Sequence, residues 1–283
     1  MTALESGAVP ELLADGFVFG EGPRWHDGRL WLSDMHGEAV YTTTASGQTT
    51  MQLSLPGKKP SGLGFLPGGS VLIVCMAERQ LLRLDPDGTT TVHADLVDLV
   101  ADEINDMVVD ADGTAFVGSY PSERGTGVLV RVSVEGAAQI VASGLDFPNG
   151  TVISQDGRTL IVAESIGRQF TAFDIDREKN LSGRRVVATT GDAAPDGIAL
   201  DAEGGIWAGY PLAHEFRRVV PGGEVTDRVA MGEKMAIACA LGGEDRRTLF
   251  LLSAADWSAK ALQGRRTGTV ETVRVSVPGA GLP

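Results

Sequence analysis

The sequence is poor in cysteine, histidine and positive charge. Its 283 residues include 2 cysteines, 4 histidines and 24 lysines and arginines, against 37 aspartates and glutamates, which gives a net charge of −13. This excess of negative charge argues against binding to nucleic acid or to an anionic membrane surface. The chain also lacks an apolar run long enough to cross a bilayer, and no basic segment precedes an apolar one near residue 1. We therefore expect a cytoplasmic protein that acts on a small molecule.

Several common catalytic signatures are absent as well. The sequence has no Gly-x-Ser-x-Gly element, no phosphate-cradling glycine-rich loop and no pair of closely spaced cysteines. Cys75 and Cys239 stand far apart in apparent core segments. We expect two free, buried thiols in a reducing cytosol rather than a disulfide.

One turn motif recurs six times along the chain. In residues 147–164, two apolar-rich runs flank Asp156-Gly157, a dipeptide suited to the positive φ angles of a tight hairpin turn. Similar turns occur at positions 27, 68, 112, 203 and 244, so the spacing is about 41 to 47 residues. This period is typical of a four-stranded propeller blade. A β-sandwich is the alternative, but it has no reason to repeat one turn at a fixed period.

The repeat predicts an all-β fold, a six-bladed β-propeller with four antiparallel strands per blade, in a single domain over residues 1–283. Residues 1–10 are expected to be flexible. A propeller must close its ring, and we expect the N-terminal strand, Leu12 to Phe17, to pair with the C-terminal blade beside residues 267–275. We expect a monomer or a weak homo-oligomer.

Polar side chains recur at one position of the repeat, six or seven residues before the turn. This position lies near the start of the innermost strand of each blade, and innermost strands line the central channel. Five of the six repeats place an oxygen-bearing side chain there: Glu21, Ser61, Asn105, Asn149 and Asp196. Each could be only a turn former that bonds its own backbone. Their matched register instead favours a site at the channel mouth.

The chemistry of these side chains indicates a hard cation. Carboxylates and amides crowded at a narrow channel would repel or remain unsatisfied without one. Glu21 and Asp196 supply carboxylates, Asn105 and Asn149 supply amide oxygens, and no sulfur or imidazole is among them. Ca²⁺ fits best because it accepts mixed oxygen ligands, and Mg²⁺, Mn²⁺ and Zn²⁺ are alternatives.

Four short motifs, in order and spacing, resemble the SMP-30/gluconolactonase/luciferin-regenerating enzyme (LRE) family. They are Phe19-Gly20-Glu21-Gly22-Pro23-Arg24-Trp25, Asn105-Asp106, Phe147-Pro148-Asn149-Gly150 and Pro195-Asp196-Gly197. The resemblance implies a six-bladed propeller with one divalent cation, held by Glu21, Asn149 and Asp196. It also implies that Asn105 contacts the substrate.

One position departs from the family pattern. Sugar-lactone members have an arginine two residues before the substrate-contacting asparagine, and this chain has Glu103 there. A carboxylate cannot donate hydrogen bonds to substrate hydroxyls as a guanidinium does. The resemblance therefore supports metal-dependent lactone or ester hydrolysis better than it supports a sugar-lactone substrate.

The rim of the channel is expected to be apolar. The loops after the second strand of each hairpin carry aromatic and methionine side chains: Met35, Met76, Tyr120, Tyr210 and Trp257. Apolar walls with few polar groups are typical of small-molecule sites. We expect less polar lactones to be preferred over sugars.

Together these features predict a divalent-metal-dependent hydrolase acting on a lactone or related cyclic ester. Asp196 would serve as the general base, and Asn105, Glu103 and Tyr120 would bind the substrate. A phosphotriesterase-like hydrolase, or a non-hydrolytic isomerase or cyclase, could use the same residues. A non-catalytic binding scaffold is the alternative of another class, because a propeller fold does not determine function.

Overall fold

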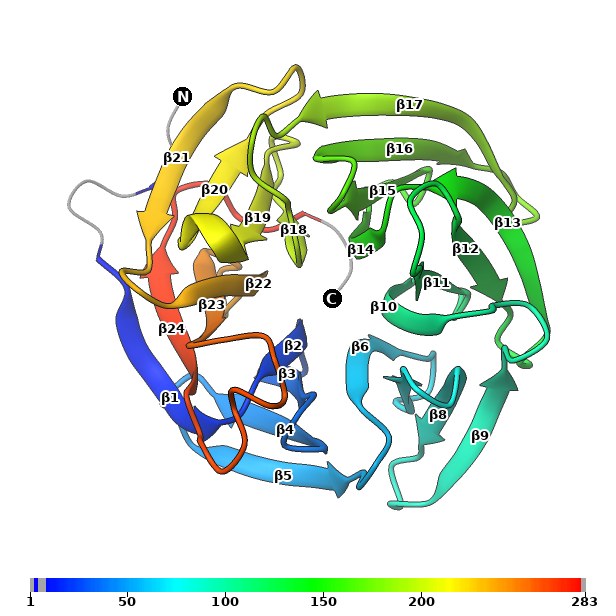
Figure 1. The fold of residues 1–283 in the computed structure, drawn as a ribbon, viewed down its shortest axis with the longest axis horizontal. Coiled ribbons are helices and arrows are strands. Elements are labelled where there is room, and N and C mark those ends of the chain that lie inside the picture. The colour runs from blue at the N-terminus through cyan, green and yellow to red at the C-terminus, as the bar shows by residue number, and fades with distance from the viewer. Residues whose placement is uncertain (1–2, 5–8, 281–283) are drawn as a thin grey trace.

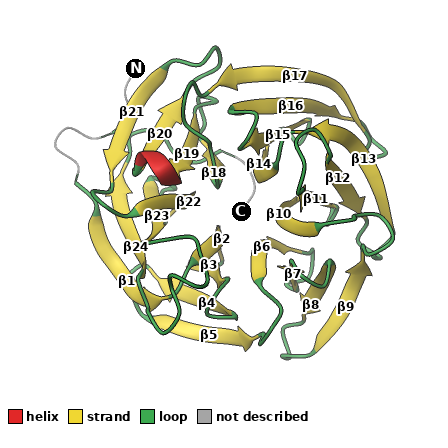
Figure 2. Cartoon of the chain, viewed as in Figure 1, coloured by secondary structure: helices red, strands yellow, loops and turns green. Residues whose placement is uncertain are grey.

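The computed structural model describes residues 3–4 and 9–280. Figure 1 shows six small sheets arranged as blades around a central axis. Each sheet has four strands, all paired antiparallel. Figure 2 shows that almost all regular structure is strand. Within the described residues the only helix is a short 3₁₀ helix, η1 (Pro211–Ala213). The prediction of an all-β six-bladed propeller is confirmed.

Five blades use consecutive strands, with the innermost strand first. Blade 1 comprises β2 (Gly20–His26), β3 (Arg29–Asp34), β4 (Ala39–Thr44) and β5 (Thr49–Ser54). Blade 2 comprises β6 (Pro60–Phe65), β7 (Val71–Cys75), β8 (Gln80–Leu84) and β9 (Thr90–Asp95). Blade 3 comprises β10 (Glu103–Val109), β11 (Ala115–Tyr120), β12 (Gly127–Val132) and β13 (Ala138–Leu145). Blade 4 comprises β14 (Pro148–Ile153), β15 (Thr159–Glu164), β16 (Gln169–Ile175) and β17 (Leu181–Thr189). Blade 5 comprises β18 (Ile198–Leu200), β19 (Ile206–Tyr210), β20 (Glu215–Val219) and β21 (Val225–Ala230).

The sixth blade closes the ring with a strand from the other end of the chain. It comprises β22 (Met235–Gly242), β23 (Thr248–Ala254), β24 (Gly268–Arg274) and β1 (Glu11–Phe17). Strand β1 pairs antiparallel with β24, and Figure 1 shows the two side by side in blue and red. The predicted ring closure is therefore confirmed.

The segment before β1 is described only in part. Residues 1–2 and 5–8, for which we expected flexibility, lie outside the described residues. Ala3 is buried, and its backbone N–H donates to the Asp227 carboxylate at 2.8 Å. Leu4 forms an isolated bridge with Val275.

The hairpin turns follow the chemistry of their residues. Asp27 and Gly28 have φ angles of 48° and 72°, and the flanking residues His26 and Arg29 pair across the turn. Positive φ at both central residues suits the right-handed twist of the two strands. Asp-Gly therefore joins the first two strands of blade 1 in the shortest possible way.

Most of the core lies between neighbouring blades, where apolar faces of adjacent sheets pack together. Cys75 and Cys239 are both free and buried in it, as expected. One ion pair is fully enclosed: Arg218 Nε donates to Asp201 Oδ2 at 2.6 Å, and both side chains are about 1 % exposed or less. In the described part of the chain, no helix is long and apolar enough to cross a membrane.

Candidate metal centre

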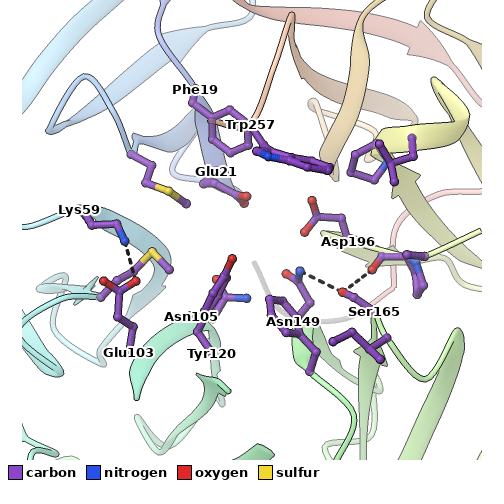
Figure 3. A pocket seen from close by; sticks show the side chains of 18 of the residues that line it. Phe19, Glu21, Lys59, Glu103, Asn105, Tyr120, Asn149, Ser165, Asp196 and Trp257 are labelled. Atoms are coloured by element: carbon purple, nitrogen blue, oxygen red, sulfur yellow. Dashed lines mark hydrogen bonds and ion pairs between the residues drawn. The ribbon is translucent and has the colours of Figure 1, made fainter. Parts of the chain in front are cut away.

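A cavity of about 610 Å³ opens at one end of the ring. Four predicted site residues line it, each from a different blade: Glu21 on β2, Asn105 on β10, Asn149 on β14 and Asp196 just before β18. Figure 3 shows their polar ends directed toward a common space. The structure therefore brings together four of the five residues that the repeat register selected.

Irregular pairing at the start of the innermost strands aims these side chains. The ladder between β2 and β3 shifts register between Glu21 and Arg24. Equivalent shifts occur between Ile104 and Met107 and between Pro148 and Thr151. Such bulges bend a strand and redirect its side chains, and they often lie beside functional sites.

Glycines next to the site residues let the innermost strands approach closely. A Cβ on Gly150 would lie 2.5 Å from the Ile198 backbone nitrogen in the next blade. A Cβ on Gly22 would lie 2.6 Å from the Ser61 backbone oxygen, also in the next blade. Only glycine permits this contact between backbones. The side chains that precede these glycines are thereby brought around one narrow channel.

The two carboxylates are in an unfavourable electrostatic environment. Burial raises the pKa of Glu21 well above its usual value, and the charges of Asp196 and Asp106 raise it further. Burial also raises the pKa of Asp196 to about 7, an effect that the Asn149 side chain partly offsets. Neither Glu21 nor Asp196 has an ion-pair partner among the described residues. Two ionised carboxylates placed this way require a nearby positive charge.

The nearest buried cation is already engaged. Arg24 donates to the Asp106 carboxylate at 3.0 Å and also to the backbone oxygens of Pro23 and Met107. Both side chains of this pair are less than one tenth exposed. Asp106 itself does not line the cavity and faces Arg24 instead. The ion pair underlies the site without neutralising Glu21 and Asp196.

The donor set fits a hard divalent cation. Asn149 Nδ2 donates to Ser165 Oγ at 3.2 Å, and Ser165 Oγ donates to the Pro195 oxygen at 2.7 Å. These bonds, drawn in Figure 3, leave the amide oxygen of Asn149 for another partner. No three His, Cys, Asp or Glu side chains gather into a metal-binding group in the described chain. An ion here would thus need amide oxygens beside the two carboxylates, a combination that suits Ca²⁺.

Two predicted substrate-binding residues also line the cavity. Tyr120 is 42 % exposed and packs edge-to-face on Phe147, with 4.4 Å between ring centroids. Glu103 Oε2 accepts a hydrogen bond from Lys59 Nζ at 2.5 Å. The sequence analysis missed Lys59, because it belongs to another blade and no motif connects it with Glu103. Lys59 places a cationic donor beside the position where Glu103 itself cannot donate.

Two expected positions lie elsewhere. Ser61 is 1 % exposed and does not line the cavity, so its placement at the channel mouth was wrong. Tyr210 is also fully buried, beneath the Arg217 guanidinium, because η1 begins directly after it. Pro211 and Leu212 of that helix occupy the rim instead. The expected rim residues that do line the cavity are Met35, Met76, Tyr120 and Trp257.

Known proteins resemble this chain in sequence and in fold. A 6-deoxy-6-sulfogluconolactonase of Pseudomonas putida is 28% identical over 94% of this chain and 94% of its own length. A luciferin-regenerating enzyme superposes with a TM-score of 0.83 at 19% identity, covering 98% of this chain and 99% of its own. A calcium-binding regucalcin from Agrobacterium tumefaciens superposes with a TM-score of 0.80 at 24% identity, covering 95% and 94%.

A family model extends over most of the propeller. Residues 19–255 match the SMP-30/gluconolactonase/LRE-like region. This range starts just before Glu21 and contains Asn105, Asn149 and Asp196. The chain therefore belongs to the SMP-30/gluconolactonase/LRE-like family.

Proposed function

We propose that this protein is a divalent-metal-dependent hydrolase of lactones or related cyclic esters. The observation that carries the proposal is the convergence of two unpaired carboxylates and two amides on one largely apolar cavity. The name of the Pseudomonas putida relative supports lactones as the substrate class. The name of the Agrobacterium tumefaciens regucalcin supports Ca²⁺ as the first ion to test.

Three residues would hold the ion: Glu21 and Asp196 through carboxylate oxygens, and Asn149 through its amide oxygen. When bound, such an ion would polarise a carbonyl and lower the pKa of a coordinated water. Asn105, whose Nδ2 lies 3.5 Å from the Pro148 oxygen, would orient the substrate at the cavity wall. The apolar residues around these groups would limit the access of water and strengthen each polar contact.

Asp196 is the residue best suited to move a proton. Its pKa is about 7 without an ion, and a bound divalent cation would lower it, so that Asp196 would be ionised at neutral pH and able to accept a proton. A carboxylate has two oxygens, so one could serve the ion while the other accepts a proton from the attacking water. The side chain is also held close to Asn149, which orients it.

A substrate panel with defined cations tests this function. The protein is treated with a chelator and assayed against aliphatic, aromatic and sugar lactones and a phosphotriester, with Ca²⁺, Mn²⁺, Zn²⁺ or Mg²⁺ restored singly. We expect lactone hydrolysis that disappears with chelation and returns with at least one ion. Absence of lactone turnover with every ion would contradict the proposal.

The same panel separates the alternatives. Preferential turnover of the phosphotriester would indicate a phosphotriesterase-like enzyme on the same residues. Tight cation binding by calorimetry, with no turnover of any substrate, would indicate a binding scaffold. Cytoplasmic location and a monomeric or weakly associated state stay predictions, to be checked by fractionation and by light scattering.

A further inference from the structure

The loop between β23 and β24 differs from its counterparts in the other blades. The second and third strands of blades 1, 2 and 4 are joined by residues 35–38, 76–79 and 165–168. In blade 6 the equivalent connection spans residues 255–267. Figure 1 shows this loop, in orange, crossing in front of the strands of blade 1. A long loop at the rim of a propeller is a common place for functional residues.

Several contacts anchor this loop to blade 1 and to β1 of its own blade. Leu262 is 1 % exposed and packs in a cluster with Phe19. Arg266 Nη1 donates to the Gly16 oxygen at 2.8 Å. His36 Nε2 lies 2.9 Å from the Trp257 backbone oxygen, and because a carbonyl only accepts, Nε2 must carry the proton. The loop is therefore an ordered wall of the cavity.

Trp257 projects from this wall with much of its indole uncovered. The side chain lines the cavity together with Phe19, and Figure 3 shows it near Glu21. It is 55 % exposed, whereas Trp207 is completely buried. A single exposed apolar residue is ordinary. An exposed indole that borders a binding cavity, on a backbone held by His36, is instead suited to pack against a ligand.

We propose that Trp257 is a specificity-determining residue that packs against an apolar or aromatic substituent of the lactone. This inference rests on the proposed lactonase function and narrows its substrate class. The lactone carbonyl would lie at Glu21 and Asp196, and the substituent would extend toward the loop. The charged pair of Lys59 and Glu103 lies on another part of the wall, and Arg168 also lines the cavity. The indole of Trp257 adds a broad apolar surface at the rim.

Two lactones with the same ring test this role. Wild type, Trp257→Ala and Trp257→Phe are compared on γ-butyrolactone and γ-phenyl-γ-butyrolactone, with the ion that supports turnover. We expect Trp257→Ala to lower kcat/KM for the phenyl lactone at least tenfold, mainly through KM. The unsubstituted lactone should change less than threefold, and Trp257→Phe should restore most of the loss. Lys260→Ala, on the exposed part of the same loop, is the matched control and should behave as wild type.

Binding of an unreactive analogue makes the test independent of turnover. Calorimetry with 5-phenylpyrrolidin-2-one should give an affinity for wild type that falls at least tenfold in Trp257→Ala. If no lactone is hydrolysed but this difference persists, the proposed function fails and the role of Trp257 stands. Equal losses on both lactones, no loss on the phenyl lactone, an equal effect of Lys260→Ala, or no lactam binding by wild type would each overturn the inference.

Discussion

Replacing Asp196 with asparagine should stabilise the cation-free protein while removing cation binding. Burial raises the pKa of this carboxyl from its usual 3.8 to about 7. A raised folded-state pKa means that the folded protein binds the proton more tightly than the unfolded chain does. Below about pH 4 Asp196 is protonated in both states and costs the wild type no stability. The free energy of unfolding then falls progressively between about pH 4 and 7, and above pH 7 this loss is complete.

The size of this loss of stability follows from the change in the pKa of Asp196. A rise from 3.8 to about 7 corresponds to about 4 kcal/mol at pH 8. This is an upper value, because Asp196 is partly exposed and screening by solvent reduces the penalty. Urea unfolding with chelator at pH 5 and pH 8 measures it. We expect Asp196→Asn to exceed wild type by a few kcal/mol at pH 8, by much less at pH 5, and to gain nothing from Ca²⁺.

Asp106→Asn provides a control of opposite sign. Asp106 is also a buried carboxylate whose pKa is raised by burial, but it is paired with Arg24, which is itself buried. Its removal leaves the guanidinium without its charge partner, so we expect a loss of about 3 to 5 kcal/mol at pH 8. An Asp196→Asn protein that is no more stable than wild type at pH 8 would refute the electrostatic account of the site. So would stabilisation by both substitutions.

Three further predictions concern the site and its frame. Glu21→Ala and Asn149→Ala should each lose Ca²⁺ binding in calorimetry and lactone turnover together; loss of turnover with intact binding would remove that residue from the ligand set. Gly150→Ala should lower the free energy of unfolding by about 1 to 3 kcal/mol and weaken cation affinity, because the added carbon would meet the Ile198 backbone at 2.5 Å. Arg218→Met should lower the free energy of unfolding by about 3 kcal/mol, because the buried Asp201 carboxylate loses its ion-pair partner. An unchanged urea midpoint would contradict this prediction.

The fold was predictable because one turn recurs at a fixed period. A propeller turns that period into equivalent positions in space, so Asn149 and Asp196 could be placed in one channel from their distance to the next turn. For these two residues, the residue type and its distance from the next turn were enough to predict the position. The same rule failed for Ser61, although β6 has the same register shift, because its short side chain is buried and does not reach the cavity.

Contacts between blades could not be predicted from the sequence. The pairing of Lys59 with Glu103 joins segments that no motif connects, and it appears only when blades 2 and 3 are side by side. Tyr210 was placed at the rim because it ends a strand, but the short helix that follows fills that place. Both depend on how neighbouring elements pack, which periodicity and propensity do not describe.

The glycine contacts between innermost strands separate what can vary in this protein from what cannot. At Gly150 the backbone of one innermost strand lies directly against the backbone of the next, so main-chain atoms set the spacing between these strands. A variant with a new substrate would therefore keep the innermost strands and gain its selectivity through changes in the loops at the rim. Directed evolution libraries should accordingly be built in residues 255–267 rather than in the strands below.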